Sequence, residues 1–374
     1  MTRQKPRRIG LAIVGGGRIG TFRGQIAGEH PQVDWIGVAE LRPERLAKCG
    51  ADIDADFVTT DYKELLARTE VTAVIIATGE SQHAQPALAA AERGHSMLIE
   101  KPLATDIAES EEVLARITST GVDTVVGYSQ RFRRRWLTVK DRIASGAIGE
   151  VSLVTSRSFM NRLVPLSKFA GSEDSTALTP MMVAGTHPLD LMMWFMAGNA
   201  VKRVYGRSVD KVFGRTHKGI DATMALIEMV DGSAANITVA WSLPTSWPGA
   251  VDSLHIGVIG TEGVFTVDDS HSDVIMAVNE GRAEGYAPDS TRRVDFLGGY
   301  LAGDVALGQL RGPLRDETVA WLNRLSLGVS THHATVIEAH DRLMLTKAID
   351  LSAHLGRPVE LPLDAISERR QRAR

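Results

Sequence analysis

Short apolar runs separated by amphipathic segments characterise the first third of the chain. The apolar runs cover residues 9–14, 33–39, 73–77, 96–100 and 123–128. Each run has the length of a buried strand, and the segments between them carry apolar residues at helical spacing. Asp61 and Asp106 each precede one of these segments and are expected to be helix N-caps. The pattern predicts an α/β domain with a doubly wound parallel sheet.

After about residue 150 the pattern changes to longer strands in which apolar and polar residues alternate. These strands cover residues 150–159, 201–209, 221–230, 233–242 and 253–260. Alternation is typical of a mainly antiparallel sheet with one solvated face. Two helices are expected in this part, over residues 187–198 and 334–356. A chain of 374 residues also favours two domains, which the change of pattern separates into residues 1–127 and 128–374.

Composition and charge exclude several classes of protein. The net charge is -3, and the basic runs at residues 3–8 and 369–374 stand at the chain ends, so neither nucleic acid nor an anionic membrane is an expected partner. No apolar window is long enough to span a membrane. The single cysteine, Cys49, excludes an internal disulfide and a cysteine-based metal site, and fits the reducing cytoplasm.

A glycine pattern follows the first predicted strand. Gly15, Gly17 and Gly20 form G-x-G-x-x-G between a strand and a helix, with Arg18 and Ile19 inside the motif. Such a turn brings backbone amides and a helix N-terminus to a pyrophosphate. Glu40 ends the next strand, where a carboxylate accepts from ribose hydroxyls and repels a 2'-phosphate. The pair predicts NAD as the cofactor.

NADP stays possible at this point. Arg42 and Arg45 follow Glu40 closely, and either guanidinium would bind a 2'-phosphate if Glu40 turned away.

Two further stretches carry candidate chemistry. In "LIEKPLATD" the fourth predicted strand ends on Glu100 and Lys101 before Pro102, and in "VAGTHPLD" His187 begins a helix three residues before Asp190. Taken alone, the first stretch is a solvated strand end, and His187 is a cap or a core histidine.

With these motifs in this order, the chain resembles the Gfo/Idh/MocA family of oxidoreductases. The resemblance runs through "GGGRIG", "ATGESQHAQPAL", "EKPLATD", "GYSQRF", "SGAIGEV" and "GTHPLD". It implies an NAD(P)-binding Rossmann domain over residues 1–127. It also implies an α/β domain over residues 128–374 that binds substrate through its loops, and that forms a homodimer or homotetramer through a large, mainly antiparallel open sheet.

The resemblance gives Lys101 and His187 catalytic roles. Lys101 would contact both cofactor and substrate and stabilise negative charge on the alcohol oxygen, with Glu100 near the nicotinamide. His187 would be the base or proton relay, and with Asp190 would contact substrate. The family places an aspartate four residues before this histidine, and here that residue is Val183, so the partner of His187 is left open.

Other candidates follow from the same resemblance. Thr78 and His83 would touch the cofactor, and the substrate contacts would be Tyr128, Arg131, Asn161 and Arg162. A structural salt bridge is an equal alternative for Arg131, and a solvated loop for Asn161 and Arg162. Adjacent His332 and His333 do not converge well on an ion, so no metal is expected.

The predicted function is hydride transfer between the nicotinamide and a secondary hydroxyl or ketone of a sugar, polyol or related cyclic alcohol. Two alternatives stay open for this architecture. One is redox-neutral, NAD-dependent cleavage of glycosides, and the other is a non-catalytic dinucleotide-binding regulator.

Overall fold

The computed structural model describes residues 6–170, 178–247, 253–269, 274–284, 287–297, 302–365 and 367–368. Residues 3–5 of the first basic run and all of the second, 369–374, therefore lie outside the described residues. The chain divides into two compact units. Unit 1 combines Met1–Phe132 with Val305–Leu343, and unit 2 combines Arg133–Asp304 with Met344–Arg374. The predicted domains, residues 1–127 and 128–374, have one boundary, whereas the chain leaves unit 1 after Phe132 and returns to it at Val305.

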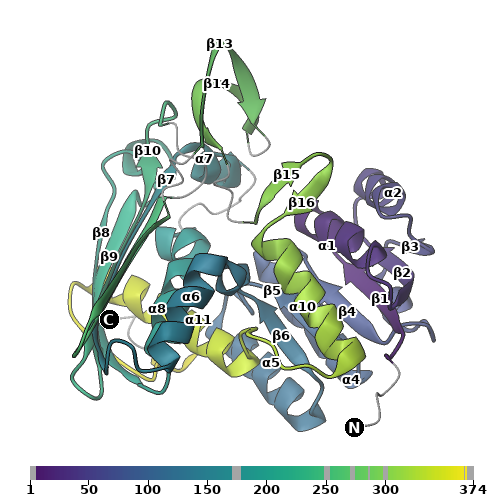
Figure 1. The fold of residues 1–374 in the computed structure, drawn as a ribbon, viewed down its shortest axis with the longest axis horizontal. Coiled ribbons are helices and arrows are strands. Elements are labelled where there is room, and N and C mark those ends of the chain that lie inside the picture. Colours follow the sequence, from purple (N-terminus) through teal and green to yellow (C-terminus); the bar gives the residue numbers. More distant parts are fainter. Residues whose placement is uncertain are drawn as a thin grey trace. The chain divides into compact units, whose positions relative to one another are not determined.

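The sheet of unit 1 is parallel and has the strand order β3-β2-β1-β4-β5-β6 (Figure 1). Its strands are β1 (Ile9–Val14), β2 (Val33–Ala39), β3 (Phe57–Thr59), β4 (Ala73–Ile76), β5 (Ser96–Glu100) and β6 (Thr124–Gly127). The order reverses between β1 and β4, where ligands bind at the carboxyl ends of such sheets. The predicted doubly wound parallel sheet is confirmed, and the short strand β3 is an addition to the five predicted strands.

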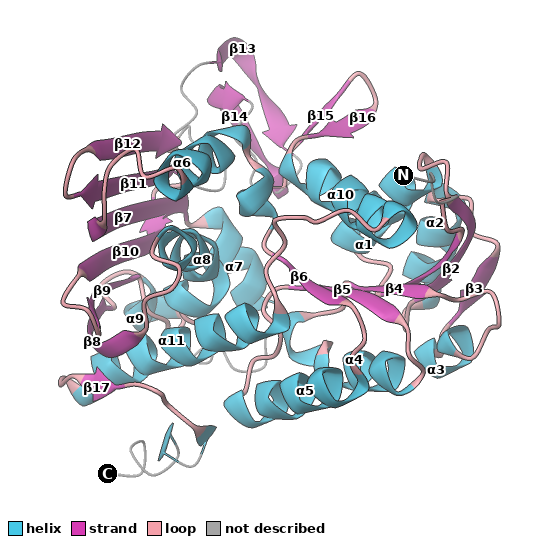
Figure 2. Cartoon of the chain, turned by 60° about the horizontal axis from the view of Figure 1, so that its bottom comes forward, coloured by secondary structure: helices cyan, strands magenta, loops and turns pink. Residues whose placement is uncertain are grey.

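Helices cover both faces of this sheet. They are α1 (Arg18–Gly28), α2 (Pro43–Asp52), α3 (Tyr62–Leu66), η1 (Glu80–Gln82), α4 (Ala84–Glu92), α5 (Ile107–Thr120) and η2 (Ser129–Phe132). Figure 2 shows α4 and α5 on one side of the sheet and α1 on the other. Asp61 accepts from Lys63 N, and Asp106 accepts from Ala108 N, so both predicted N-caps are confirmed.

Alternate residues of β1 enter two separate apolar clusters. Leu11 and Ile13 pack in one cluster, and Ala12 and Val14 pack in the other. Successive side chains of a strand point to opposite faces, so a strand covered on both sides must be apolar throughout. This requirement explains why the first strand reads as a continuous apolar run.

A late segment of the chain completes unit 1. The hairpin of β15 (Asp304–Ala306) and β16 (Gln309–Arg311) precedes α10 (Pro313–Leu327), which lies beside α1 (Figure 2). Trp321 and Leu322 of α10 join the apolar cluster of Leu11. The guanidinium of Arg324 donates to both carboxylate oxygens of Asp123, at 2.7 and 2.9 Å. The sequence pattern does not predict this helix, because the buried face of α10 includes polar Glu317 and Thr318.

The large sheet of unit 2 has the order β12-β11-β7-β10-β9-β8-β17. Its strands are β7 (Val151–Asn161), β8 (Val201–Val209), β9 (Ala222–Met229), β10 (Ala234–Leu243), β11 (Ser253–Gly260), β12 (Val264–Asp269) and β17 (Val359–Glu360). Strands β7 and β10 are parallel and the other described pairs are antiparallel. The predicted mainly antiparallel sheet is confirmed.

The remaining described elements of unit 2 are helices, a π-helical turn and a separate two-stranded sheet. They are α6 (Arg134–Ala144), α7 (Leu163–Ala170), the π-helical turn η4 (Met181–Gly185), α8 (Thr186–Phe195), α9 (Phe213–Thr216), and the hairpin of β13 (Val274–Glu284) and β14 (Ala287–Leu297). Helix α11 (Val336–Leu355) begins in unit 1 and ends in unit 2.

Candidate functional site

The loop between β1 and α1 has the backbone of a dinucleotide-binding turn. Gly15 has a φ of +103°, and a Cβ there would lie 2.5 Å from the carbonyl oxygen of Ala77. A Cβ at Gly20 would lie 2.0 Å from the carbonyl oxygen of Gly15, whereas a Cβ at Gly17 would meet nothing within 4 Å. Gly15 and Gly20 therefore permit the turn and the helix packing. Gly17 leaves open space before the first turn of α1, where a pyrophosphate would bind.

Glu40 lies directly after β2 and is hydrogen-bonded to this loop. Its Oε2 accepts from the backbone amide of Gly16 at 3.0 Å, and its Oε1 accepts from the amide of Arg42 at 3.0 Å. Each carboxylate oxygen keeps a further lone pair for a hydroxyl. The carboxylate is thus oriented before any ligand arrives.

A cavity of about 290 Å³ opens beside Glu40 at the carboxyl end of the sheet. Gly15, Glu40 and Thr78 are among its lining residues, and Val14, Ala39, Leu41, Thr60, Tyr62, Ser81, Gln82, Gln85 and Pro86 complete it. An apolar cavity with a few polar groups at the point where the strand order reverses suits the adenosine end of a dinucleotide. The structure thus brings together three of the predicted cofactor residues.

Arg18 and Ile19 form the first turn of α1. The guanidinium of Arg18 is exposed and lies 5.9 Å from the ring centroid of Phe22, and Ile19 is half-buried. Both residues are at the helix N-terminus, where an anion binds to free amides.

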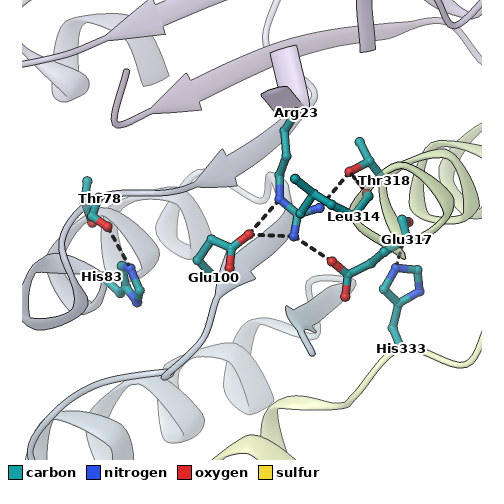
Figure 3. A network of polar contacts seen from close by, with 8 residues as sticks. All are labelled: Arg23, Thr78, His83, Glu100, Leu314, Glu317, Thr318 and His333. Carbon is teal, nitrogen blue, oxygen red and sulfur yellow. Dashed lines mark hydrogen bonds and ion pairs between the residues drawn. The ribbon is translucent and has the colours of Figure 1, made fainter. Parts of the chain in front are cut away.

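Glu100 is the last residue of β5, and Lys101 follows it. The Nε of Arg23 donates to Glu100 Oε1 at 2.8 Å (Figure 3). Lys101 is half-buried, and the peptide bond between Lys101 and Pro102 is cis. Glu100 therefore has a partner inside unit 1, and its predicted contact with the cofactor stays a prediction.

Arg23 is not among the site residues predicted from the sequence, although the sequence carries a signal for it. It is fully buried, and it shares the buried face of α1 with Gly20, Gly24 and Ala27. A charged residue at helical spacing among small residues on a buried face requires an internal counter-charge.

His83 is buried and lies between η1 and α4, in the segment that follows β4. Its Nδ1 is 2.7 Å from the carbonyl oxygen of Pro102, and its Nε2 is 3.2 Å from the carbonyl oxygen of Thr78. The ring therefore connects the loop after β4 with the segment after Lys101. Its predicted role toward the cofactor stays a prediction.

Tyr128 and Arg131 are both 2% exposed, next to the end of β6. Arg131 Nη2 donates to Glu338 Oε1 at 2.9 Å. Glu338 also accepts from the amide of Thr335, whose hydroxyl accepts from Glu338 N, which is a capping box at the start of α11. Arg131 thus forms a structural salt bridge, which was one of the two roles that the sequence allowed for it.

Asn161 ends β7 in unit 2, Arg162 follows it, and both side chains bind a neighbouring segment. Asn161 Nδ2 donates to the carbonyl oxygens of Pro244, Thr245 and Trp247 at 3.1–3.2 Å. Arg162 donates through Nη2 to the carbonyl oxygen of Ser242 at 2.8 Å. Both side chains have backbone partners, and their predicted contact with substrate is untested.

His187 and Asp190 lie in the first turns of α8 in unit 2, with exposed fractions of 9% and 1%. The turn η4 before them contains Val183, and a Cβ at Gly185 would lie 3.2 Å from Cγ2 of Val239, so this glycine lets the helix start lie close to β10. A π-helical turn of this kind is frequent at functional sites.

A carboxylate that the sequence analysis did not single out lies at the start of η4. Thr179 donates from Oγ1 to Asp350 Oδ2 of α11 at 2.7 Å, and accepts from Met182 N at 3.0 Å. Thr179 and Asp350 are 171 positions apart in sequence, so no local sequence signal indicates the contact.

His332 and His333 have different environments. His332 is exposed, whereas His333 is buried with its Nε2 3.1 Å from the carbonyl oxygen of Glu317. Burial lowers the pKa of His333 to about 3. Among the described residues, no three histidine, cysteine or acidic side chains gather as a metal site. No helix in the described ranges is long and apolar enough to cross a membrane.

The glycine turn, Glu40 and the cavity define a dinucleotide-binding Rossmann domain of an oxidoreductase. Residues 9–128 match the model of the oxidoreductase family with an NAD-binding Rossmann fold, and residues 136–266 match the GFO/IDH/MocA C-terminal domain. The chain belongs to the GFO/IDH/MocA family of NAD-dependent oxidoreductases, as the resemblance predicted.

Similar proteins agree with this assignment. The chain is 24% identical over 291 residues to the NAD-dependent scyllo-inositol 2-dehydrogenase of Bacillus subtilis, covering 76% of this chain and 82% of that one. The structure of GenD2 from gentamicin A biosynthesis, in complex with NAD, superposes with a TM-score of 0.77 at 22% identity and covers 96% of this chain and 98% of that one. Scyllo-inositol dehydrogenase from Lactobacillus casei, with NAD(H) and scyllo-inositol bound, gives 0.75 at 18% identity and covers 95% and 99%.

Proposed function

We propose that this protein oxidises a secondary hydroxyl of a cyclic polyol or sugar, with NAD as hydride acceptor. The observation that carries the proposal is Lys101, at the carboxyl end of β5 in the sheet whose glycine turn and Glu40 form the NAD site. The similarity to a scyllo-inositol 2-dehydrogenase supports a cyclic polyol as the substrate class.

The reaction removes a hydride from carbon and a proton from oxygen, and leaves a ketone and NADH. NAD supplies the hydride acceptor when bound. In this proposal the ammonium of Lys101 stabilises the negative charge that develops on the alcohol oxygen, and His187 receives the proton. Val183 replaces the expected aspartate, so Asp190 is the acid closest in sequence to His187 for orienting its ring.

In this proposal the substrate is bound by the side chains that the family resemblance indicates. They are Tyr128, Arg131, Asn161, Arg162 and Asp190. Arg131, Asn161 and Arg162 also have the internal partners described above, so the proposal gives them a second function on top of a structural one.

NAD is preferred over NADP in this proposal. The carboxylate of Glu40 is held by two amides beside the cavity, and it would repel a 2'-phosphate at that place. Arg42 and Arg45 are both exposed shortly after it, and either guanidinium would permit some use of NADP.

We also propose that the protein is a cytoplasmic homodimer or homotetramer that associates through the large sheet of unit 2. One face of this sheet exposes apolar side chains: Tyr205 at 44%, Met224 and Leu226 at 54%, and Val264 at 63%. Exposed apolar patches of this kind commonly mark protein interfaces. Sedimentation velocity of the wild type and of Leu226→Lys tests this, since the charged side chain should shift the protein toward monomer.

The test of the reaction follows absorbance at 340 nm with NAD and then NADP, across scyllo-inositol, myo-inositol, glucose and related polyols. Lys101→Met and His187→Asn are run beside the wild type. Oxidation of a polyol that falls by at least about a hundredfold in either variant supports the proposal. Full activity in Lys101→Met would contradict it. NAD binding without reduction by any substrate would favour the redox-neutral enzyme or the regulator.

A further inference from the structure

Three segments far apart in the sequence meet at the guanidinium of Arg23. The residue lies in α1, and it contacts Glu100 at the end of β5 and two residues of α10 (Figure 3). Its Nη2 lies 2.6 Å from Glu100 Oε1 and 2.6 Å from Glu317 Oε2. Its Nη1 donates to the hydroxyl of Thr318 at 2.7 Å.

This arrangement uses the planar geometry of the guanidinium. Arg23, Glu317 and Thr318 are all 0% exposed, whereas the side chain of Glu100 is 14% exposed. The hydroxyl of Thr318 donates to the carbonyl oxygen of Leu314 at 2.7 Å, which leaves its oxygen to accept from Arg23. A lysine has one nitrogen and cannot reach three acceptors in one plane. Arg23 is therefore held by α10 and in turn holds Glu100.

A glycine of the neighbouring strand lies next to this ion pair. Gly127 of β6 pairs with Glu100 of β5. A Cβ at Gly127 would lie 3.0 Å from Arg23 Nη2 and 3.2 Å from Glu100 Oε2. The carboxylate is thus bound by Arg23 of α1, which is itself bound by α10, and any side chain at position 127 of β6 would press against both charged groups.

The segment is also held on the other side of Lys101. His83, which is 1% exposed, contacts the carbonyl oxygen of Pro102 through Nδ1 at 2.7 Å. Lys101 therefore lies between Glu100, whose side chain is bound by Arg23, and Pro102, whose carbonyl oxygen is bound by His83. Two such contacts limit the backbone positions that Lys101 can take.

We propose that Arg23 is a positioning residue for catalysis, which holds Glu100 and thereby sets the place from which the ammonium of Lys101 reaches the reacting oxygen. The inference rests on the proposed role of Lys101. Arg23 touches neither substrate nor cofactor in this account, and it acts through the backbone of β5. A small misplacement of a catalytic group is costly, because the transition state requires a narrow range of distances.

Glu317 and Thr318 extend this role to the late segment of the chain. They belong to α10, which is separated from Arg23 by more than 290 positions in sequence. The catalytic strand end is complete only when α10 lies against α1.

The test measures kcat, KM, NAD affinity by protein fluorescence, and the deuterium isotope effect on kcat with C-deuterated substrate. The substrate is the best one of the panel above. Arg23→Lys is compared with Arg324→Met, which breaks a different ion pair of α10, the one to Asp123 just before β6. We expect Arg23→Lys to lose at least tenfold in kcat, with NAD affinity changed less than threefold and a larger isotope effect. Arg324→Met should keep kcat within twofold.

Gly127→Ala provides a second variant that keeps every charge, in case Arg23→Lys does not fold. Its methyl group should displace the ion pair by a few tenths of an ångström and lower kcat severalfold, without loss of NAD affinity. The inference would be overturned if Arg23→Lys and Gly127→Ala had the same kcat as Arg324→Met. It would also be overturned if these two variants lost kcat and NAD affinity in equal proportion.

Lys101→Met separates this inference from the proposed function. If Lys101→Met is inactive while Arg23→Lys and Gly127→Ala keep their kcat, only the positioning role fails. If Lys101→Met is fully active, the proposed role of Lys101 fails first, and the role of Arg23 fails with it.

Discussion

Glu40 accepts a hydrogen bond from the backbone amide of Gly16 at 3.0 Å, so the acidic residue after β2 is joined to the glycine turn after β1. The two parts of the dinucleotide signal are therefore in direct contact in the folded chain. The carboxylate faces a cavity lined by Gly15 and Thr78 as well. A group that is oriented before binding loses little freedom when the ligand arrives.

Replacing Glu40 should weaken NAD binding and reduce the preference for NAD over NADP. Glu40→Ala removes the acceptor for ribose hydroxyls and the charge that repels a 2'-phosphate, so we expect a loss of about tenfold or more in NAD affinity. Titration of protein fluorescence with each nucleotide measures both values. Glu44→Ala, an exposed change in the first turn of α2, is the control. An unchanged ratio of NAD to NADP affinity in Glu40→Ala would contradict the assignment.

Two glycines of the turn should respond differently to the same substitution. Gly17→Ala places a methyl group in open space, so the melting temperature should stay within about 2 °C while NAD affinity falls. Gly20→Ala places it 2.0 Å from a carbonyl oxygen and should cost about 1–3 kcal/mol of unfolding free energy. Thermal melts and NAD titrations of both variants check this. Equal melting temperatures for the two would count against the loop geometry.

His333 should make the protein less stable in mild acid. Burial lowers its pKa to about 3 from an ordinary value of 6.5, so between these pH values the unfolded chain binds more protons than the folded chain. The free energy of unfolding therefore falls as pH falls below 6.5, and this group removes about 2 kcal/mol by pH 5. Urea unfolding at pH 7 and pH 5 measures the loss, which should be smaller by that amount in His333→Gln.

His332→Gln is the matched control for this prediction, since His332 is exposed one position earlier. It should show the pH dependence of the wild type. If His333→Gln also keeps the full loss between pH 7 and pH 5, the buried neutral ring is not the cause.

Asn161 should contribute to stability through the segment it holds. Asn161→Ala leaves the carbonyl oxygens of Pro244, Thr245 and Trp247 without this donor, and we expect a cost of about 1–3 kcal/mol in unfolding free energy. Thermal melts measure it, with Asn236→Ala, which changes an exposed side chain of β10, as control. A rise in KM for the polyol in the same variant would support its proposed contact with substrate. An unchanged melting temperature would contradict the structural role.

Much of unit 1 could be predicted because its signals are local. Apolar runs, the spacing of Gly15, Gly17 and Gly20, and the caps Asp61 and Asp106 each depend on residues a few positions apart. The same holds for the alternating strands of unit 2. Helix α10 escaped prediction because its buried face includes Glu317, which reads as a solvent-exposed charge until its partner Arg23 is known.

The amino-acid sequence by itself determined the parallel sheet, the glycine turn with Glu40, the family and the place of Lys101 at a strand end. Only the tertiary structure decided that residues 305–343 complete unit 1, and that Glu100 is paired with Arg23 while Arg131 is paired with Glu338. The physical reason is that a strand or a turn depends on neighbouring residues, whereas a buried charge depends on which distant group packing brings within about 3 Å of it.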